Sequence, residues 1–585
     1  WAFLCTFFFF FKRNILFALV LDYVRKNKWT YLLVAVSLIV YDATLVIPTQ
    51  VVQRLVDAIT KQSLTEAGLF LILATLVNYG SAFIWHLKLF QQSIHFKFDM
   101  QQRAFHKLVA MRTPFYEKFR SGDMMTRFST DVEMLQDMVG YGLMIILYAG
   151  GMIAFVIPVM FLISWEISLV GMIPIVIMTF GTYKVSQPLE TKVDEARDAI
   201  SELSNEVLET VEGIRVIRAY SKKDQLSSRF AKKTAALSAR WNDIARYRAL
   251  YMPMYSLMLG LSTVLILGSG LYFMETGQVS LGQVVALQLY VVSLVEPFAM
   301  LSDFILVYQT GKTSFGKLQE LIETGDDMEE DGRKDLDHLR EIRLEDYSFS
   351  YAQASQPSLK DISLTLKAGQ TLGLVGKTGA GKTSLVRQFL RQYPVGEGTF
   401  TINGRPITDY SRKSLEALIG YVPQEHVLFS RTVWENIAMG KVQADQEEIK
   451  QAISTAAFEE DVERMADGLD TTIGERGVSI SGGQKQRISI ARAFIREPEL
   501  LILDDSLSAV DARTERQIIQ NIQQERAEKT NIIVTHRLSA VHHADWVLVL
   551  DEGRIIEEGT PDQLLAQEGW YYQQYQRQQA QGEEE

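Results

Sequence analysis

The chain has 585 residues, of which 47% are hydrophobic, and a formal net charge of −11, so it is long enough for several domains. It carries no long basic tract, and this argues against nucleic acid as a partner. The single cysteine, Cys5, excludes an intramolecular disulfide framework and any CxxC metal site. Apolar runs dominate up to about residue 306, whereas the chain from about 337 onward has the short apolar strands of a soluble α/β protein.

The N-terminal stretch from Trp1 to Phe11 is an almost unbroken apolar run followed by Lys12 and Arg13. It is too short to span a bilayer, and its basic residues follow the run where a signal peptide places them before it. We interpret residues 1–28 as an interfacial segment, or their first part as an artefact of the gene assignment.

Six segments are apolar over the roughly 20 residues that a helix needs to cross a bilayer. They lie near 29–49, 67–88, 139–162, 167–187, 250–274 and 281–305. The connections after the second and fourth segments are long and rich in Lys and Arg, for example Arg112 and Arg215. Basic residues near span ends mark the cytoplasmic side, so we expect the long connections, both termini and the soluble part inside the cell.

Both long connections keep a helical apolar spacing, so their helices are expected to continue past the membrane. Each contains a turn that suits a short transverse helix, Pro114 to Asp123 in the first and Glu212 to Tyr220 in the second. These turns are either solvated hairpins or levers that touch the soluble domain. We therefore predict a transmembrane domain over 29–322, an exposed acidic linker over 323–337 and a soluble domain over 338–585.

The strongest motif follows the apolar strand Thr371 to Val375 and opens a helix near Lys382. Its glycines let backbone N–H groups surround phosphates, and the helix N-terminus favours an anion. We predict that Lys382 reaches the β- and γ-phosphates of ATP and that the Thr383 hydroxyl helps to hold Mg²⁺. The predicted ATP-binding residues here are Gly376, Lys377, Thr378, Gly379, Ala380, Gly381, Lys382, Thr383 and Ser384.

Two further apolar strands end in polar residues that suit phosphate chemistry. Leu500 to Leu503 is followed by Asp504 and Asp505, and Ile532 to Thr535 by His536. We predict that Asp504 binds Mg²⁺ through water, that Asp505 acts as a base or orients water, and that His536 contacts the γ-phosphate. A lone histidine is more often structural, but its place at a third strand end favours function.

A segment about 20 residues before Asp504 resembles the signature sequence of ATP-binding cassette (ABC) proteins, with Ile480 where Leu is usual. It reads Ile480-Ser481-Gly482-Gly483-Gln484-Lys485-Gln486-Arg487. Other family matches are Tyr351 for the aromatic that stacks on adenine, Gln424 for the glutamine loop, Thr472 to Gly477 for an exporter-type loop, and Ser508 to Asp511 for the loop after the second carboxylate. From about residue 15 the chain resembles ABC exporters, above all halves of heterodimeric bacterial multidrug exporters of the BmrC and LmrC type.

The resemblance implies a multi-domain fold, in which an all-α transmembrane domain of six helices (the type I exporter fold) precedes an α/β P-loop cassette. The cassette would have a mixed sheet and a helical subdomain near 425–495. The family's activity is export driven by ATP hydrolysis across the bacterial cytoplasmic membrane, with Mg²⁺ as cofactor and Gln424 as a catalytic and Mg²⁺-binding residue. Two cassettes would face each other head to tail, so that the signature residues Ser481, Gly482, Gly483 and Gln484 bind the partner's ATP, with Asp511 in the adjoining loop.

One departure from the family pattern concerns the residue after Asp504. Fully active members usually carry Glu there, whereas this chain has Asp505, whose carboxylate sits roughly 1 Å short of that position; such a misplacement can cost on the order of 100-fold in rate. We therefore predict a heterodimer in which this chain holds the slow, degenerate ATP site and the partner supplies the catalytic Glu. The alternative is a homodimeric exporter or flippase of lipids or peptides.

Ionisable residues inside spans usually face a cavity or pair with a neighbouring helix. Asp42 in the first span and Glu296 in the sixth are candidates for a substrate cavity, and Trp85 could offer it apolar surface. This combination favours small amphipathic compounds, hydrophobic cations among them. An ATP-gated channel or receptor would keep the same nucleotide motifs, and steady substrate-coupled hydrolysis would tell against it.

Overall fold

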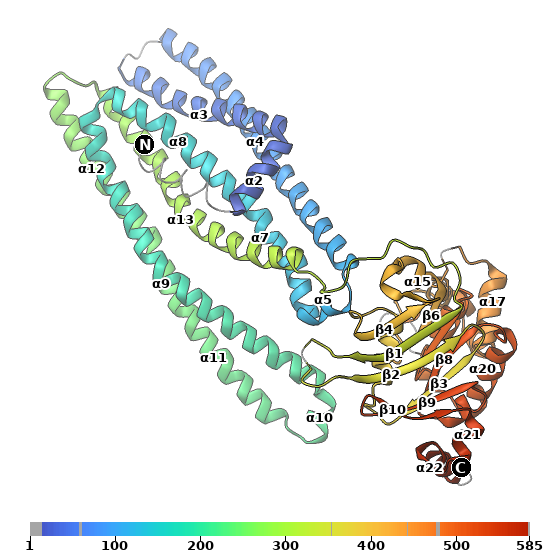
Figure 1. Cartoon of the computed structure of the whole chain (residues 1–585). Helices are drawn as coiled ribbons and strands as arrows, with labels where there is room; N and C mark the ends of the chain where they lie inside the picture. The colour runs from blue at the N-terminus through green and yellow to red at the C-terminus, as the bar shows by residue number, and fades with distance from the viewer. Residues whose placement is uncertain (1–14, 58–60, 353, 442, 475–479, 583–585) are drawn as a thin grey trace. The chain divides into compact units, whose positions relative to one another are not determined.

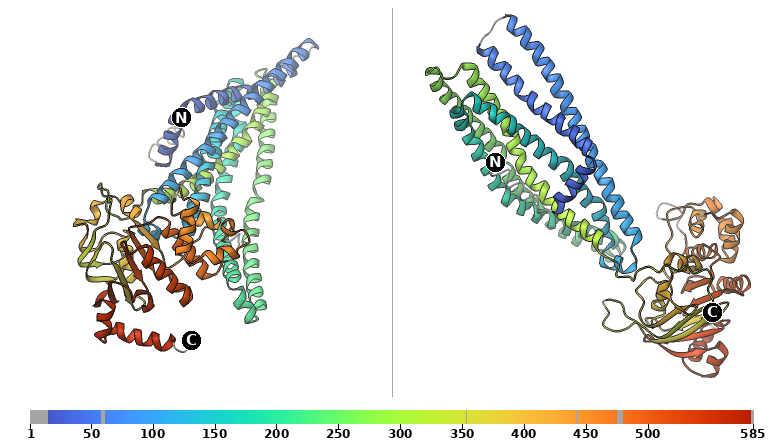
Figure 2. Two further views of the ribbon diagram at one scale, coloured as in Figure 1. Left: turned by 90° about the vertical axis from the view of Figure 1, so that its right-hand side faces the viewer. Right: turned by 45° about the horizontal axis from the view of Figure 1, so that its top comes forward.

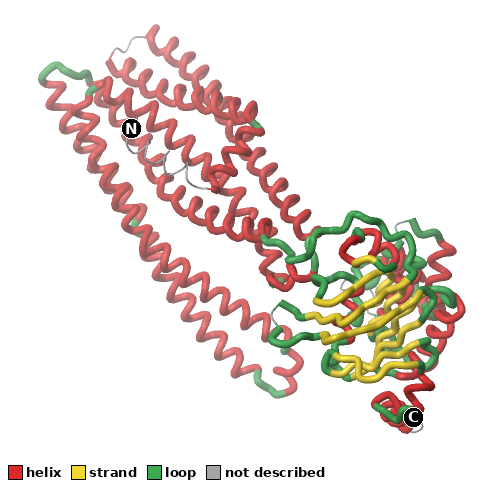
Figure 3. Tube along the Cα trace, viewed as in Figure 1, coloured by secondary structure: helices red, strands yellow, loops and turns green. Residues whose placement is uncertain are grey.

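The computed structural model describes residues 15–57, 61–352, 354–441, 443–474 and 480–582. The chain divides into two compact units. The first, here called the membrane unit, comprises Trp1–Ala110 with Arg120–Thr324, and the second, the cassette unit, comprises Met111–Phe119 with Gly325–Glu585. All described strands lie in the cassette unit (Figure 3). The apolar run Trp1 to Phe11 lies outside the described residues.

The described part of the membrane unit consists of helices joined by short turns, and six of its segments are long and apolar enough to cross a membrane. Each of them contains one predicted span, which confirms the six-helix domain. The helices are α2 (Ile15–Lys26), α3 (Lys28–Asp57), α4 (Lys61–Ala110), α6 (Ser121–Thr126), α7 (Val132–Asp137), α8 (Leu143–Ile163), α9 (Trp165–Glu212), α10 (Ile214–Ala219), α11 (Lys223–Arg248), α12 (Tyr251–Glu275) and α13 (Leu281–Glu323).

The third membrane segment is interrupted by two π-helical turns that the sequence pattern did not predict, η1 (Arg127–Asp131) and η2 (Met138–Gly142). At η2 the helices approach closely, because a Cβ on Gly140 would lie 2.8 Å from the Ser93 hydroxyl oxygen. At η1, the buried Arg127 forms an ion pair of 2.9 Å with Glu320 near the end of α13. Both π turns therefore coincide with contacts to neighbouring helices.

Two of the corners between successive spans are short, and a serine caps the helix that follows each of them. Ser164 alone separates α8 from α9, and its hydroxyl accepts a hydrogen bond from the Ile167 N–H. Ser280 forms a capping box with Gln283 at the start of α13. Beyond the membrane α9 and α11 run side by side as a long hairpin (Figures 1 and 2).

Both predicted transverse helices are present, as α5 (Thr113–Lys118) and α10. They differ in surroundings. In α5, which belongs to the cassette unit, Phe115 is fully buried and Glu117 accepts a hydrogen bond from the Tyr393 hydroxyl. No residue of α10 is buried.

The cassette unit contains two sheets. The larger has the order β10-β9-β3-β8-β7-β6, in which the neighbours from β9 to β6 are parallel and β10 is an antiparallel edge. The smaller is antiparallel, with the order β2-β1-β4-β5. The strands are β1 (Glu341–Phe349), β2 (Leu359–Lys367), β3 (Thr371–Gly376), β4 (Glu397–Ile402), β5 (Arg405–Pro406), β6 (Ile419–Val422), β7 (Leu500–Asp504), β8 (Thr530–Val534), β9 (Trp546–Asp551) and β10 (Arg554–Gly559).

The parallel sheet is buried on both faces, which explains why its strands are continuous apolar runs. In β7, Ile502 faces the core shared with the small sheet, and Leu501 and Leu503 face the core shared with the helices. The helices and short turns of the unit are α14 (Lys382–Phe389), η3 (Ile407–Asp409), α15 (Arg412–Leu418), α16 (Val433–Ala438), α17 (Gln446–Thr455), α18 (Glu459–Arg464), η4 (Gly468–Asp470), α19 (Gly482–Phe494), α20 (Ala512–Glu525), η5 (Leu538–Val541), α21 (Pro561–Ala566) and α22 (Trp570–Gly582).

Helices α16 to α19 form the predicted helical subdomain, because they fill the described chain between β6 and β7. In the acidic linker, predicted to be exposed, Asp327, Glu330 and Asp331 are exposed, whereas Asp326 and Glu329 are partly buried. Asp326 accepts a hydrogen bond of 3.3 Å from the Arg112 N–H, and Glu329 one of 2.6 Å from the Val395 N–H. These two carboxylates are half-buried because they satisfy backbone donors that would otherwise lack partners.

Candidate functional site

The candidate residues of the cassette follow the carboxyl ends of four adjacent parallel strands, β3, β8, β7 and β6. The carboxyl ends of parallel strands lie at one edge of the sheet, where ligands of such sheets usually bind. The phosphate-loop motif follows β3, His536 follows β8, the Asp504–Asp505 pair ends β7, and Gln424 follows β6. The topology thus gathers sequence-distant motifs into one site.

The phosphate loop depends on glycine at two positions where the chain passes close to other backbone. Gly376 has φ +145°, and a Cβ there would lie 2.1 Å from the Leu550 carbonyl oxygen. Gly381 has φ +101° and caps α14, and a Cβ there would lie 2.7 Å from the Ser358 carbonyl oxygen. Both positions exclude other residues by backbone conformation and by space.

Lys382 is buried at the start of α14, and its Nζ donates hydrogen bonds of 2.8 Å to the carbonyls of Gly376 and Lys377. Burial lowers the pKa of this amine, while the nearby charges of Asp505 and Asp504 act in the opposite direction. The ammonium is thus held inside the loop by neutral oxygens, which phosphate oxygens can replace. Lys377, Thr378 and Gly379 form the exposed tip of the loop, and Ala380 is buried beneath it.

Thr383 and Asp504 meet as a candidate metal pair, with 3.4 Å between the hydroxyl oxygen and Oδ1. Asp504 is 1% exposed, and this burial raises the pKa of its carboxyl. Its Oδ2 is also buried and has no hydrogen-bond partner within the described chain. A hydroxyl beside a carboxylate with a spare oxygen is the donor set that Mg²⁺ prefers, so these residues fit that ion.

Asp505 has a left-handed backbone, with φ +48°, that is held from both sides. Its N–H donates to the Val534 carbonyl at 2.9 Å, and its carbonyl accepts from the Ser508 hydroxyl at 3.0 Å. Its charge acts on both Lys382 and His536. The structure therefore brings Asp505 together with the phosphate loop and the residue after β8.

His536 is exposed where it follows β8, beside the phosphate loop. Partial loss of water around its imidazole lowers the pKa of the ring, and the charge of Lys382 lowers it further, while Asp505 opposes the shift. The ring is therefore neutral at pH 7 and can donate one N–H to a phosphate oxygen. This arrangement agrees with the predicted place of His536.

Tyr351 lies beside the phosphate-loop helix, where its hydroxyl donates to Ser384 at 3.1 Å and accepts from Arg387 at 3.3 Å. Its ring packs edge-to-face on Tyr393, with centroids 4.9 Å apart. We did not identify Arg387 or Tyr393 from the sequence. Arg387 could have been found, because it lies one helical turn after Thr383 and so on the same face.

Gln424 is exposed in the loop after β6, and no hydrogen bond of its side chain occurs within the described residues. Gln424 lies at the same edge of the sheet as the other candidate residues, but its side chain is not hydrogen-bonded to them. Of the exporter-type loop Thr472 to Gly477, the part from Glu475 to Gly477 lies outside the described residues.

The signature segment begins α19 with a capping box between Ser481 and Gln484. The Ser481 hydroxyl accepts the Gln484 N–H at 3.2 Å and keeps its own hydrogen for another acceptor. Ser481 and Gly482 are exposed, and Gly483 packs beside the Ala509 carbonyl. The start of this 13-residue helix is therefore open to a ligand.

The loop after Asp505 is tied to both flanking helices. Asp511 caps α20, and hydrogen bonds, first from the Thr514 side chain, lower the pKa of its carboxyl to about 2. The buried Gln486 of α19, which we did not identify as functional from the sequence, accepts from the Ala509 N–H at 3.1 Å. The signature helix and the Ser508–Asp511 loop are thus fixed to each other.

The candidate substrate residues of the membrane unit have contrasting surroundings. Asp42 of α3 is 2% exposed and faces Gly151 of α8, where a Cβ would lie 1.9 Å from its Oδ2. Glu296 is exposed and accepts a long hydrogen bond of 3.5 Å from the Tyr148 hydroxyl. Trp85 is fully buried, so it offers no open surface, contrary to our expectation.

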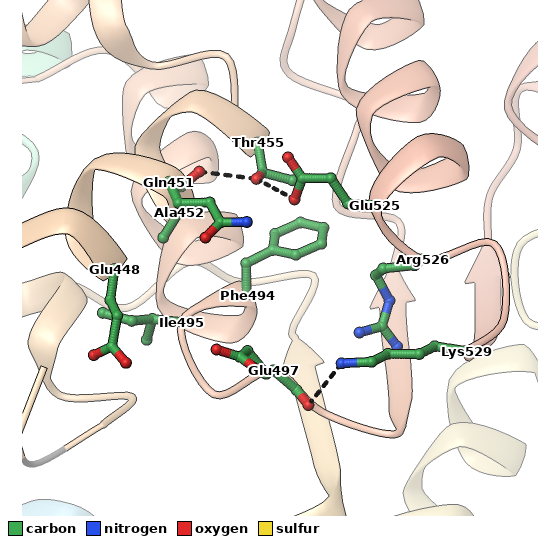
Figure 4. Close-up of a pocket in the computed structure, with 10 residues that line it drawn as sticks. All are labelled: Glu448, Gln451, Ala452, Thr455, Phe494, Ile495, Glu497, Glu525, Arg526 and Lys529. Carbon is green, nitrogen blue, oxygen red and sulfur yellow. Dashed lines mark hydrogen bonds between the residues drawn. The ribbon is translucent and has the colours of Figure 1, made fainter.

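A cavity of about 170 Å³ lies between α17, α19 and α20 (Figure 4). It is remote from the nucleotide edge, because Glu497 and Lys529, which line it, precede the amino ends of β7 and β8. Two hydrogen bonds join residues that line it: the Thr455 hydroxyl donates to Glu525 at 2.6 Å, and the Lys529 amine donates to the Glu497 carbonyl at 3.3 Å.

Comparison with known proteins agrees with both units. Residues 31–298 match the family model described as ABC transporter transmembrane region, and residues 359–508 match the one described as ABC transporter. The chain is 38% identical over 563 residues to the probable multidrug resistance ABC transporter ATP-binding/permease protein YheI of Bacillus subtilis, covering 95% of this chain and 96% of that protein. It is 32% identical over 572 residues to the multidrug resistance-like ATP-binding protein MdlA of Escherichia coli, covering 96% of each.

Among solved structures, a bacterial Atm1-family ABC exporter with ATP bound shares the fold, with a TM-score of 0.78 and 24% identity. The match covers 95% of this chain and 99% of that one. The strand-end cluster, the six spans and the relatives converge on one assignment. The chain belongs to the ABC exporters, as a multi-pass protein of the cytoplasmic membrane whose fused cytoplasmic cassette hydrolyses ATP to drive export.

Proposed function

We propose that the chain is one half of a heterodimeric multidrug exporter of the BmrC and LmrC type and that it holds the slow ATP site of the pair. The exported compounds would be amphipathic or hydrophobic. Support comes from the two relatives described above, whose names contain multidrug resistance. The heterodimer part of the proposal rests on Asp505, which stands where fully active members of the family usually carry Glu.

In this chain's own site, the adenine of ATP would stack on Tyr351, and the phosphates would lie in the loop from Gly376 to Thr383. Lys382 would exchange its two carbonyl partners for β- and γ-phosphate oxygens. Thr383, Asp504 and Gln424 would hold Mg²⁺, which supplies neutralisation of phosphate charge when bound. His536, neutral at pH 7, would donate its N–H to the γ-phosphate, and Asp505 would orient the attacking water.

The signature of this chain would serve the ATP of its partner. Within the described residues the Ser481 hydroxyl donates no hydrogen bond, and the exposed Gly482 opens the helix N-terminus to an anion. Gly483 and Gln484 complete this surface, and Asp511 holds the neighbouring loop. An intact signature beside a shortened Asp505 would give one fast and one slow site.

The second transverse helix also supports a dimer. Val216 and Tyr220 at the tip of the α9–α11 hairpin are 59% and 73% exposed, although both are apolar or aromatic. The corresponding α5 of the first connection is buried in its own cassette unit. We assign the partner chain's cassette as the surface that covers α10. The reason is that α5, the equivalent short helix of the first connection, is already buried in a cassette.

The observation that carries the slow-site proposal is the anchored backbone of Asp505. A shorter side chain could be compensated by moving the backbone toward the nucleotide. Hydrogen bonds of its N–H to Val534 and of its carbonyl to Ser508 oppose such a movement. The missing methylene therefore remains a deficit of roughly 1 Å at the carboxylate, enough to cost on the order of 100-fold in rate.

The test compares steady-state ATP hydrolysis by the wild-type chain in lipid with that of Asp505→Glu. We expect a nearly inactive wild type and a substantial gain in the variant. Asp346→Glu is the matched control, since Asp346 is an exposed aspartate with the same φ of +48° in β1 and should leave the rate unchanged. Fast hydrolysis by the wild type with no gain from Glu would reject the slow site and favour a homodimeric exporter or flippase.

A further inference from the structure

The C-terminal helix α22 packs against η5, the turn that follows His536 and Arg537. Tyr571 at its start is fully buried, and its N–H donates to Glu557 at 3.0 Å. One turn later, Tyr575 stacks on His542, with ring centroids 6.4 Å apart. Because residues spaced by four and seven share a helix face, Gln578 points toward the same loop.

Gln578 forms two hydrogen bonds that bracket Arg537. Its Nε2 donates to the His536 carbonyl at 2.7 Å, and its Oε1 accepts from the Leu538 N–H at 2.9 Å. A side-chain amide donates through its nitrogen and accepts through its oxygen without carrying charge. The pair of bonds fixes the peptide groups on both sides of Arg537 and therefore the backbone from which the His536 imidazole projects.

The bracketed residue connects the same loop to the catalytic carboxylate. The Arg537 guanidinium donates to the Ser508 carbonyl at 3.2 Å and to the Val510 carbonyl at 3.3 Å. It also pairs at 2.5 Å with Glu515 of α20, whose carboxylate is buried. Since the Ser508 hydroxyl donates to the Asp505 backbone carbonyl, hydrogen bonds and the short chain segments between them link α22 through Arg537 to the backbone of Asp505.

We propose that Gln578 is a positioning residue for ATP hydrolysis, by which the C-terminal helix holds His536 in place for the γ-phosphate. The inference rests on the proposed role of His536. It assigns a part in the reaction to a helix that contributes no residue to the nucleotide motifs. The anchoring of α22 through Tyr571 and Glu557 is independent of Gln578, so removal of the amide should leave the helix docked.

The test uses the full chain in lipid as wild type, Gln578→Ala, His536→Ala and the double variant. Gln579→Ala is the matched control, because the neighbouring Gln579 amide donates to Tyr575 of its own helix and, within the described chain, to no residue of the loop. The first readout is hydrogen–deuterium exchange at the histidine C2 carbon across a pH series, which reports the pKa and exposure of each imidazole without turnover. We expect Gln578→Ala to accelerate exchange at His536 and to move its pKa toward the ordinary 6.5, with exchange at His338 unchanged.

The second readout is ATP hydrolysis, measured in the Asp505→Glu background where this chain's own site turns over. We expect Gln578→Ala to lower the rate on the order of tenfold, with ATP affinity and thermal unfolding midpoint unchanged, and to add nothing to His536→Ala. Unchanged exchange at His536, or losses that add in the double variant, would overturn the inference. If His536→Ala itself leaves the rate intact, the assigned role of His536 has failed instead, and that outcome is recognised separately.

Discussion

Two aspartates, one in each unit, are almost equally buried but differ in their neighbours. Asp504 of the cassette unit is 1% exposed and lies at a strand end beside the Thr383 hydroxyl and the charge of Lys382. Asp42 of the membrane unit is 2% exposed, packs against Gly151, and forms no ion pair within the described chain. Its Oδ1 has no hydrogen-bond partner there.

The contrast shows two ways of keeping an ionisable group inside a protein. A buried charge needs a partner, and in the cassette the phosphate-loop motif provides it from the same chain. In the membrane unit the described chain provides none, so the partner has to come with a ligand or the group stays neutral. We therefore expect Asp42 to respond to the charge of the transported compound, and Asp504 to respond to the nucleotide alone.

The largest effect is expected from Asp504→Asn. In the Asp505→Glu background, where this chain's own site is expected to turn over, hydrolysis should fall by at least about 100-fold, because the Mg²⁺-binding carboxylate is lost from a buried site. The thermal unfolding midpoint should stay unchanged or rise, since burial disfavours the charged form of Asp504 and raises its pKa. ATPase assays and thermal unfolding of the same preparation check both, and a large drop in the midpoint would contradict this account.

A smaller effect is expected from Asp42→Asn. Export of a hydrophobic monocation should fall about tenfold, the equivalent of ~1.4 kcal/mol, while export of an uncharged compound and basal hydrolysis should not change. Transport into inverted vesicles with one cationic and one neutral dye measures the difference. Glu275→Gln, at the exposed end of α12, is the control. Equal losses of export for both dyes would show that Asp42 does not distinguish cationic from uncharged compounds.

The packing at Asp42 can be tested by adding one methyl group. Gly151→Ala places a Cβ 1.9 Å from the Asp42 Oδ2, so either the Asp42 side chain has to leave its position or α3 and α8 have to move apart, at a cost of about 1–3 kcal/mol. Gly150→Ala is the control, because nothing lies within 4 Å of a Cβ there. Thermal unfolding in lipid should separate the two variants, and Asp42→Ala should rescue Gly151→Ala. Equal midpoints for both glycine variants would refute this close contact.

The smallest effect is expected in the pH dependence of ATP hydrolysis, and it tests the cassette unit. Partial loss of water around the ring and the charge of Lys382 lower the pKa of His536, so its neutral form persists below the ordinary value of about 6.5. The acid limb of hydrolysis in the Asp505→Glu background should therefore have its midpoint below pH 6.5 and disappear in His536→Ala. A midpoint above 6.5 that depends on His536 would show that the imidazole is stabilised as a cation.

The sequence predicted most of the cassette site because its residues occupy contiguous motifs at strand ends. A glycine loop after β3 and the carboxylates after β7 are recognisable without knowing which strands are neighbours, and parallel topology then brings them together. Gln578 and Arg387 carry no such local signal. Their roles come from contacts across the fold, such as that between α22 and the loop after β8.

The membrane unit was predictable in its spans but less so in its interior. Hydropathy and span length locate six segments, yet they say nothing of which face of a helix packs. Burial of Trp85 and the π turns at η1 and η2 depend on the neighbours of each helix. The short helices α5 and α10 were both predicted, but only the structure shows that α5 belongs with the cassette unit.

The membership of α5 in the cassette unit has a consequence for the order of synthesis. Glu117 and its partner Tyr393 are 276 residues apart in the chain. At the usual rate of about 5–20 residues per second, the ribosome needs roughly 14 to 55 s to make that stretch. During this interval Phe115 has left the ribosome, but the part of the cassette that buries it has not yet been made. The nascent exporter therefore exposes the apolar side chains of α5 until the cassette has folded.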